Sequence, residues 1–176
     1  MKESVPHILF ETERLIVRHY TKDDGDNFFL LNGDEEIMRY IRPAKTREET
    51  DLFLSQIIEK YSEYPSVGRW AAEDKYTGVF VGSYAFIPIE GGEEMQLGYA
   101  LLKQSWGKGY ATELTIAGLQ FVFTKTDLAE VFAVTEVLNT ASQKVLLKAG
   151  FTLHRTYKEG TKDLFQYVFL KKDFRP

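Results

Sequence analysis

The stretch from Gln104 to Glu113, QSWGKGYATE, has the residue types and spacing that suit the binding of a phosphate group. Gly107 and Gly109 stand one residue apart, and a helix-like run follows them. Glycine lets the backbone approach a ligand closely, and the first N–H groups of a helix carry a partial positive charge. The stretch therefore predicts an anion site made mainly of backbone donors.

Three phosphate-binding patterns compete for these glycines, and the surrounding sequence separates them. A dinucleotide site needs a third glycine, but Thr112 stands there, and predicted antiparallel strands precede the loop in place of a βαβ unit. A nucleotide P-loop needs G-x-x-x-x-G-K-[ST], which the sequence lacks. The remaining pattern is a strand ending at Leu102, a loop of donors facing a pocket, and a helix whose N-terminus faces a pyrophosphate.

The elements before this loop are predicted from alternation and capping chemistry. The segment 14–20 alternates like a strand, and Thr21 to Asp24 has helix-starting chemistry. Thr46 and Glu49 have capping-box spacing, which predicts a second helix that runs to about residues 64–65. Strands are expected at 68–74, 79–87 and 94–102, and the turn-rich sequences between them favour an antiparallel meander.

The elements after the loop alternate between helix and strand. Apolar residues on two faces, among them Leu114, Phe121 and Ile116, predict a largely buried helix. A strand is expected at 130–135, followed by a helix from Asn139 to Ala149 with Asn139 as N-cap and Gly150 just past its end. Phe151 is expected to fold back onto that helix, and segments 151–157 and 164–170 to close the chain as a hairpin.

Composition indicates one globular domain over residues 1–176, with 44% hydrophobic residues and no apolar run near the roughly 18 residues that span a bilayer. The first residues lack the pattern of a secretory signal, so a cytoplasmic location without membrane contact is expected. Zero cysteines exclude disulfides and thiolate chemistry, and the three histidines lack metal-ligand spacing, so no metal is expected. A net charge of -4 without a basic block argues against nucleic-acid binding.

Three motifs together resemble GNAT acetyltransferases, and in particular their ribosomal-protein N-terminal acetyltransferase (RimJ/RimL-like) branch. Gln104-x-x-Gly107-x-Gly109, preceded by LGYALL, resembles the family's coenzyme A loop, Q/R-x-x-G-x-G/A. Asn139-Thr-Ala-Ser142 followed by VLLKAGF resembles the helix beside the pantetheine arm. The opening ETERLIVR resembles the first strand of that branch. The resemblance covers nearly the whole chain, with the motifs in the expected order.

The resemblance implies an α/β fold of the α+β type: a mixed, mostly antiparallel sheet of about seven strands, flanked by helices, whose fourth and fifth strands splay apart. Acetyl-CoA is then the cosubstrate and enters the gap, while the acceptor amine approaches from the opposite side. The backbones of Leu101 and Leu102 are expected to bind the pantetheine chain. The implied coenzyme loop contains Gln104, Ser105, Trp106, Gly107, Lys108, Gly109, Tyr110 and Ala111, and the donors from Ser105 through Tyr110 are expected to hold the pyrophosphate.

Candidate catalytic residues follow from what acetyl transfer needs: a neutral amine, a polarised thioester and a proton for the departing thiolate. In the related branch, the residue two before the Gly-Tyr of the fourth strand is often a glutamate, but here Gln96 stands there and cannot act as a base. Glu94 shares that face unless a bulge intervenes, and is the substitute candidate, with a solvated surface charge as the alternative.

Proton delivery to the sulfur falls to Ser142, because the tyrosine common four residues later in the family is Leu146 here. Asn139 is expected to contact the cosubstrate. The alternative role of each is simple helix capping. Tyr40, Tyr64, Trp70, Tyr84 and Phe86 are candidates for an acceptor pocket, with the hydrophobic core as their alternative.

The sequence thus predicts an acetyl-CoA-dependent N-acetyltransferase that transfers acetyl directly to a primary amine, either a protein N-terminus or a small molecule. Without a glutamate at Gln96, an α-amine is favoured over a lysine, because its pKa of about 8 leaves more neutral amine at pH 7. The competing hypothesis is an acyl-CoA-binding sensor or interaction module without turnover. Oligomeric state is left open, with a homodimer as one option.

Overall fold

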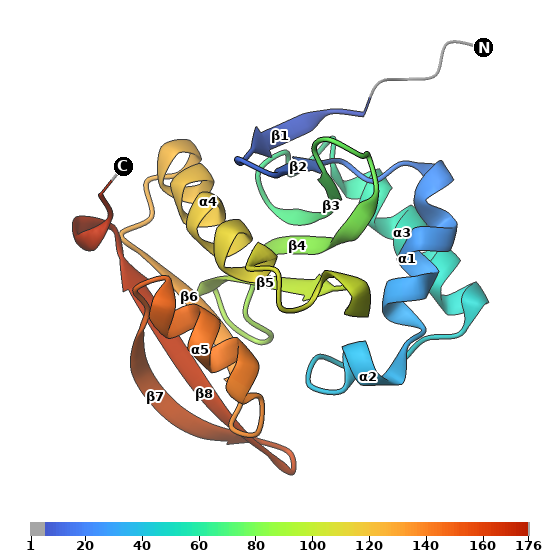
Figure 1. The fold of residues 1–176 in the computed structure, drawn as a ribbon. Helices are drawn as coiled ribbons and strands as arrows, with labels where there is room; N and C mark the ends of the chain where they lie inside the picture. The colour runs from blue at the N-terminus through green and yellow to red at the C-terminus, as the bar shows by residue number, and fades with distance from the viewer. Residues whose placement is uncertain (1–5, 176) are drawn as a thin grey trace.

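A computed structural model describes residues 6–175, which form one eight-stranded sheet with helices on both faces (Figure 1). The strand order is β1-β2-β3-β4-β5-β6-β8-β7. The strands are β1 (Ile8–Glu11), β2 (Leu15–Arg18), β3 (Gly68–Asp74), β4 (Phe80–Pro88), β5 (Met95–Leu101), β6 (Glu130–Glu136), β7 (Thr152–Glu159) and β8 (Lys162–Leu170). The helices are α1 (Gly25–Asn32), α2 (Glu35–Met38), α3 (Arg47–Lys60), α4 (Tyr110–Lys125) and α5 (Thr140–Lys148), with short 3-10 turns η1 (Lys22–Asp24), η2 (Lys103–Ser105) and η3 (Lys171–Asp173).

The predicted mixed sheet is confirmed, with one strand more than expected. The additional strand is β1, which pairs antiparallel with β2 at the sheet edge. All neighbouring strands are antiparallel except β5 and β6. These two are joined through a single residue pair, Gln96 and Phe132, and do not pair beyond it. The predicted splay between the fourth and fifth strands is therefore present, as β5 and β6.

Alternating side chains divide the core between the two faces of the sheet. On one face, Trp70, Tyr84 and Phe86 pack with Leu114 and other residues of α4. On the other face, Ala71 and Phe80 pack with residues of α1, α2 and α3. Figure 1 shows α4 and α5 together on one side and α1 to α3 on the other. The gap between β5 and β6 therefore has α4 and α5 on one side and α1 to α3 on the other.

Local capping chemistry explains where the helices begin and end. Thr46 and Glu49 form the predicted capping box of α3, although the helix ends at Lys60, earlier than expected. Asn139 caps α5 as predicted, and Gly150 follows that helix with φ +97. The N–H groups of Gly150 and Phe151 donate to the carbonyls of Leu147 and Leu146, the pattern of a Schellman motif. Phe151 is 2% exposed and so folds back as predicted.

The long helix α4 is mostly buried, as its two apolar faces predicted, but Ile116 is 48% exposed. Gly118 lets this helix lie directly on the Tyr84 ring, because a Cβ at Gly118 would come within 2.5 Å of the tyrosine oxygen. Among residues 6–175, no helix is long and apolar enough to cross a membrane.

Candidate active site

A cavity of about 1050 Å³ follows the gap between β5 and β6 and reaches both faces of the sheet. Its walls include β4, β5, the glycine loop, the start of α4, the N-terminal half of α5 and, on the opposite face, residues of α1 and α2. Tyr40 lines it, whereas Trp70, Tyr84 and Phe86 are core residues and Tyr64 is 55% exposed. One continuous cavity thus connects the glycine loop with the face covered by α1 and α2.

The glycine loop contributes a run of free backbone donors to this cavity. Gly107 and Gly109 have φ values of +73 and +80, which favour glycine. From Gly107 through Thr112, no backbone N–H has an acceptor within hydrogen-bonding distance among residues 6–175. By contrast, the N–H groups of Ser105 and Trp106 donate to Leu102 and Lys103 in the turn η2. The predicted donor set therefore moves two residues along, to 107–112.

Some side chains of the loop line the cavity and others do not. Ser105, Trp106, Tyr110 and Ala111 line the cavity, but Gln104 and Lys108 are exposed and lie outside its lining. Trp106 donates its indole N–H to the carbonyl of Leu101 at 2.9 Å and so ties the loop to the end of β5. The predicted cosubstrate contacts of Gln104 and Lys108 stay predictions, with both side chains outside the cavity lining and the Lys108 N–H within the run of free donors.

An ionic contact from the start of the chain holds the loop against α4. Arg14 donates to the Glu113 carboxylate at 2.7 Å and to the carbonyl of Lys108 at 2.9 Å. The pKa of Arg14 is raised, mainly by this hydrogen bond to Glu113. Glu113 lies in the first turn of α4, where the helix dipole favours a negative charge. The segment ETERLIVR therefore has a structural role in the site, because it orders the donors of residues 107–112.

The backbone groups of β5 that face the gap belong to Leu101 and Tyr99. Leu102 donates its N–H to Val81 in β4 and accepts from Ser105, so its backbone is already occupied. Residues opposite each other in an antiparallel pair alternate in hydrogen bonding, so the groups of Leu101 and Tyr99 point away from β4 toward β6. The β4 pairing thus favours Tyr99 and the N–H of Leu101 over Leu102 as the pantetheine-binding backbone, which stays a prediction, because the Leu101 carbonyl already accepts from Trp106.

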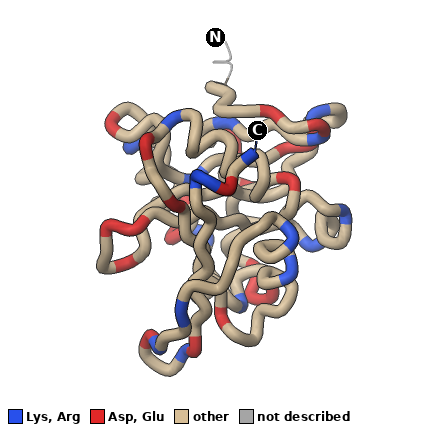
Figure 2. The backbone as a smooth tube through the Cα atoms, turned by 90° about the vertical axis from the view of Figure 1, so that its left-hand side faces the viewer, with Lys and Arg blue, Asp and Glu red and all other residues tan. Residues whose placement is uncertain are grey.

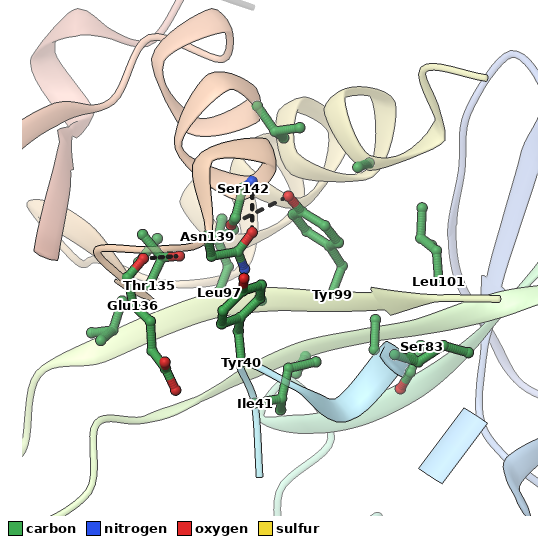
Figure 3. Close-up of a pocket in the computed structure, with 18 of the residues that line it drawn as sticks. Tyr40, Ile41, Ser83, Leu97, Tyr99, Leu101, Thr135, Glu136, Asn139 and Ser142 are labelled. Carbon is green, nitrogen blue, oxygen red and sulfur yellow. Dashed lines mark hydrogen bonds between the residues drawn. The ribbon is translucent and has the colours of Figure 1, made fainter. Parts of the chain in front are cut away.

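Two hydroxyl groups meet at the wall of the gap (Figure 3). The Tyr99 oxygen lies 3.4 Å from the Ser142 oxygen, and both residues line the cavity. Burial raises the pKa of Tyr99, so its hydroxyl keeps its proton at neutral pH. In the sequence, Tyr99 stands out only as part of the strand motif LGYALL. Its alternation with buried Leu97 and Leu101 was the available signal, because it places all three on one face.

The first turn of α5 separates the roles of Asn139 and Ser142. The Asn139 side-chain oxygen accepts from the backbone N–H of Ser142 at 3.1 Å, so Asn139 is the cap and also lines the cavity. The Ser142 hydroxyl takes no part in this cap and faces Tyr99. Leu146, at the position where the resemblance implies a tyrosine, is 2% exposed and belongs to the core. The tyrosine near Ser142 is instead Tyr99, which comes from β5.

The two residues considered for amine deprotonation, Gln96 and Glu94, have different surroundings in the structure. Gln96 lines the cavity, whereas Glu94 lies outside its lining. The Glu94 carboxylate accepts from Gln166 at 2.9 Å and lies 3.6 Å from Arg155, both on the β7–β8 hairpin. These contacts favour a structural role for Glu94 between strands, and its catalytic role stays an untested prediction. Glu136, at the end of β6, does line the cavity and is ion-paired with Lys162.

Comparison with known proteins agrees with this geometry. A family model described as an acetyltransferase (GNAT) domain matches residues 14–152. YkkB of Bacillus subtilis is 30% identical over 148 residues, which cover 83% of this chain and 86% of YkkB. The fold matches a GNAT-family acetyltransferase from Bacillus anthracis with a TM-score of 0.81 and 23% identity, covering 93% of this chain and 98% of that one. It also matches RimL, a ribosomal L7/L12 α-N-protein acetyltransferase solved with coenzyme A, with a TM-score of 0.79, 17% identity and coverage of 93% and 98%. The chain therefore belongs to the GNAT acetyltransferase family and is an acyltransferase that uses acetyl-CoA as its cosubstrate.

Proposed function

We propose that this acetyltransferase moves the acetyl group directly from acetyl-CoA to a primary amine while both are bound. The observation that carries this proposal is the cavity through the β5–β6 gap, which joins free loop donors on one side to a separate acceptor face on the other. The amine nitrogen attacks the thioester carbon, the C–S bond breaks, the amine loses a proton and the thiolate gains one. No covalent enzyme intermediate is required.

The cosubstrate is held mainly by backbone groups. The pyrophosphate accepts hydrogen bonds from the N–H groups of residues 107–112, and the pantetheine chain pairs with the gap-facing backbone of Tyr99 and Leu101. In this arrangement we expect the sulfur to lie near the Tyr99 and Ser142 hydroxyls, which are 3.4 Å apart. Tyr99 then gives its proton to the thiolate, and Ser142 positions or relays it.

The acceptor enters in a partly neutral form, because Gln96 cannot take a proton and Glu94 faces the β7–β8 hairpin. This favours an α-amine, whose pKa of about 8 is closer to neutrality than that of a lysine, about 10.4. We expect kcat/KM to rise with pH until the free amine titrates, and Glu94→Gln to change it less than about twofold. A large loss in Glu136→Gln near neutral pH, shrinking at higher pH, would instead assign the base to Glu136.

Free thiol release from acetyl-CoA across a panel of α-amines, small alkylamines and a lysine peptide tests the proposal most directly. Amine-dependent thiol release, with an acetylated product seen by mass spectrometry, is the expected result. Acetyl-CoA binding without thiol release on any amine would favour the sensor hypothesis. Acetylation of the lysine peptide alone, with every α-amine inactive, would reject the acceptor class proposed here.

A further inference from the structure

Two arginines without acidic partners lie at the end of the cavity covered by α1 to α3. Arg42, which follows α2, and Arg69, in β3, both line the cavity. Within residues 6–175, neither guanidinium lies within 4.0 Å of a carboxylate oxygen, and the Arg42 Nε is buried without any acceptor. Buried arginines usually have a carboxylate or phosphate partner, so this pair is incomplete by itself.

Neighbouring residues hold the two side chains in place without neutralising them. The fully buried Asn32 accepts from Arg42 Nη2 at 2.9 Å. The Phe53 ring contacts both groups, with its centre 5.1 Å from the Arg42 guanidinium carbon and 5.7 Å from that of Arg69. Burial, together with the charge of Arg42, lowers the pKa of Arg69 to about 10. Two adjacent positive groups are therefore kept in a partly desolvated place, at a cost in stability that an anion would remove.

Two other arginines of this chain, Arg14 and Arg18, do have acidic partners. Arg18, also half-buried, pairs with Asp24 and Glu73 at 2.9 and 2.7 Å. Arg14 pairs with Glu113, and basic and acidic residues are interspersed along the backbone (Figure 2). The protein has net charge -4, so the arginine pair does not reflect a generally basic protein. Its missing partner therefore points to a ligand.

The strand register links the arginine pair to the reaction centre. Arg69 is opposite Ala85, and Ala85 is opposite Gly98 in β5, so the three form a row across one face of the sheet. Ala85 and Gly98 both line the cavity, and a Cβ at Gly98 would meet no atom within 4 Å. Two strand spacings put the Arg69 and Gly98 backbones roughly 10 Å apart. Small residues thus leave a short channel from the gap to the arginines.

We propose that the acceptor is a small amine that also carries an oxyanion, a carboxylate or a phosphate, and that Arg42 and Arg69 bind this group while the amine reaches the β5–β6 gap. This inference rests on the proposed amine acetylation and specifies its substrate class. The guanidinium fork matches both oxyanions, so their shared chemistry defines the site. The narrow lining between β3 and the α1–α3 layer, with Arg42, Arg69 and Ala85 around it, suits a small molecule.

The test compares amines that differ in one remote group. The α-amides of aspartate and glutamate are matched with those of asparagine and glutamine, so the α-amine is retained and only a carboxylate is replaced. The α-amide of phosphoserine provides the phosphate arm, and a longer peptide with an acidic second residue provides the macromolecular arm. We expect kcat/KM to be at least about tenfold higher for an acid than for its matched amide, equivalent to about 1.4 kcal/mol.

Arg69→Gln and Arg42→Gln should reduce this preference to about onefold while leaving the KM for acetyl-CoA unchanged. Lys60→Gln, which removes one exposed positive charge from α3, is the matched control and should preserve the preference. Thermal unfolding of the Arg69→Gln protein without ligand adds a second readout. If the arginine serves a ligand, its loss should leave the Tm equal or higher, because a like-charge contact is relieved. A large fall in Tm, with the preference intact in Arg42→Gln, would make the pair structural and overturn the proposal.

The outcomes also separate this inference from the proposed reaction. Acetylation of neutral amines with no preference for acids would retain the reaction and reject the oxyanion site. Preference for the acidic peptide over every small acid would reject the small-molecule class. If no amine is acetylated, calorimetry with the glutamate and glutamine α-amides decides the matter. Binding of the acid alone, lost in Arg69→Gln, would support the site, and equal or absent binding would overturn it.

Discussion

Replacing Tyr99 by phenylalanine tests the chemistry assigned to the β5–β6 gap, because it removes one hydroxyl and keeps the ring. The Tyr99 and Ser142 oxygens are 3.4 Å apart, longer than the 2.7–2.8 Å typical of O–H···O bonds. A hydrogen bond this long contributes less than about 1 kcal/mol to the free energy of unfolding. Tyr99→Phe should therefore fold normally, and any large loss of rate will reflect chemistry.

The expected loss of rate comes from the proton that the thiolate needs. Burial raises the pKa of Tyr99, so the wild-type hydroxyl is protonated throughout the neutral range and can act as an acid. General acids contribute about 10²- to 10⁴-fold, and the lower limit corresponds to about 2.7 kcal/mol of transition-state stabilisation. Tyr99→Phe should accordingly slow acetyl transfer by about 100-fold or more.

Single-turnover acetyl transfer at saturating acetyl-CoA is the appropriate assay, because product release then does not hide the chemical step. Calorimetric binding of acetyl-CoA is the control and should be unchanged. Ser142→Ala should lower the rate of acetyl transfer about tenfold. It should not disturb the start of α5, because the Asn139 cap uses the Ser142 backbone N–H. If serine acts through tyrosine, the double variant should match Tyr99→Phe. A Tyr99→Phe rate within about threefold of wild type would refute the reasoning.

Three further predictions concern binding, packing and pH. Gly107→Val should weaken coenzyme A binding by about tenfold or more in calorimetry, because valine disfavours a φ of +73, whereas Gly78→Val, with φ +68 in the β3–β4 turn, should not. Gly118→Ala should lower the free energy of unfolding in urea by about 1–2 kcal/mol, since overpacking against Tyr84 exceeds the gain in helix propensity; increased stability would contradict this packing. Burial and the charge of His7 lower the pKa of His19 below about 6.5, so the folded state binds fewer protons than the unfolded state and stability falls as pH drops below that value. His19→Phe should flatten the pH dependence of urea unfolding. An unchanged slope would show that His19 does not cause this pH dependence.

Local sequence chemistry was sufficient for the elements that carry the cosubstrate loop. Glycines at 107 and 109 permitted the positive φ values that the loop adopts, and the helix after them left its first N–H groups without intrahelical acceptors. Asn139 and Gly150 likewise marked both ends of α5, because capping depends on residues a few positions apart. These features were predictable because each arises from interactions within one or two turns of chain.

Register and side-chain pairing across the sheet were beyond the sequence. Glu94 and Gln96 share a strand face by alternation, but the β7–β8 hairpin draws Glu94 to Gln166, 72 residues away. The occupied backbone of Leu102 depends on how β4 pairs with β5, and the Tyr99–Ser142 contact depends on where α5 packs. Each of these contacts joins separate elements, so no local pattern predicts it.

The arginine pair at the proposed acceptor end of the cavity also depends on contacts between separate elements. In the sequence, Arg42 follows a short helix and Arg69 begins a strand, and each resembles an ordinary surface cation. In the folded protein, both arginines contact Phe53 and line the same cavity. The small residues Ala85 and Gly98 line this cavity between the arginines and the β5–β6 gap. Spacing in sequence thus located the glycine loop to within two residues of its free backbone donors, because these groups are adjacent in the chain. Only the tertiary structure revealed the arginine pair at the proposed acceptor end, because the two charges come from distant elements and their lack of acidic partners becomes evident only once they are brought together.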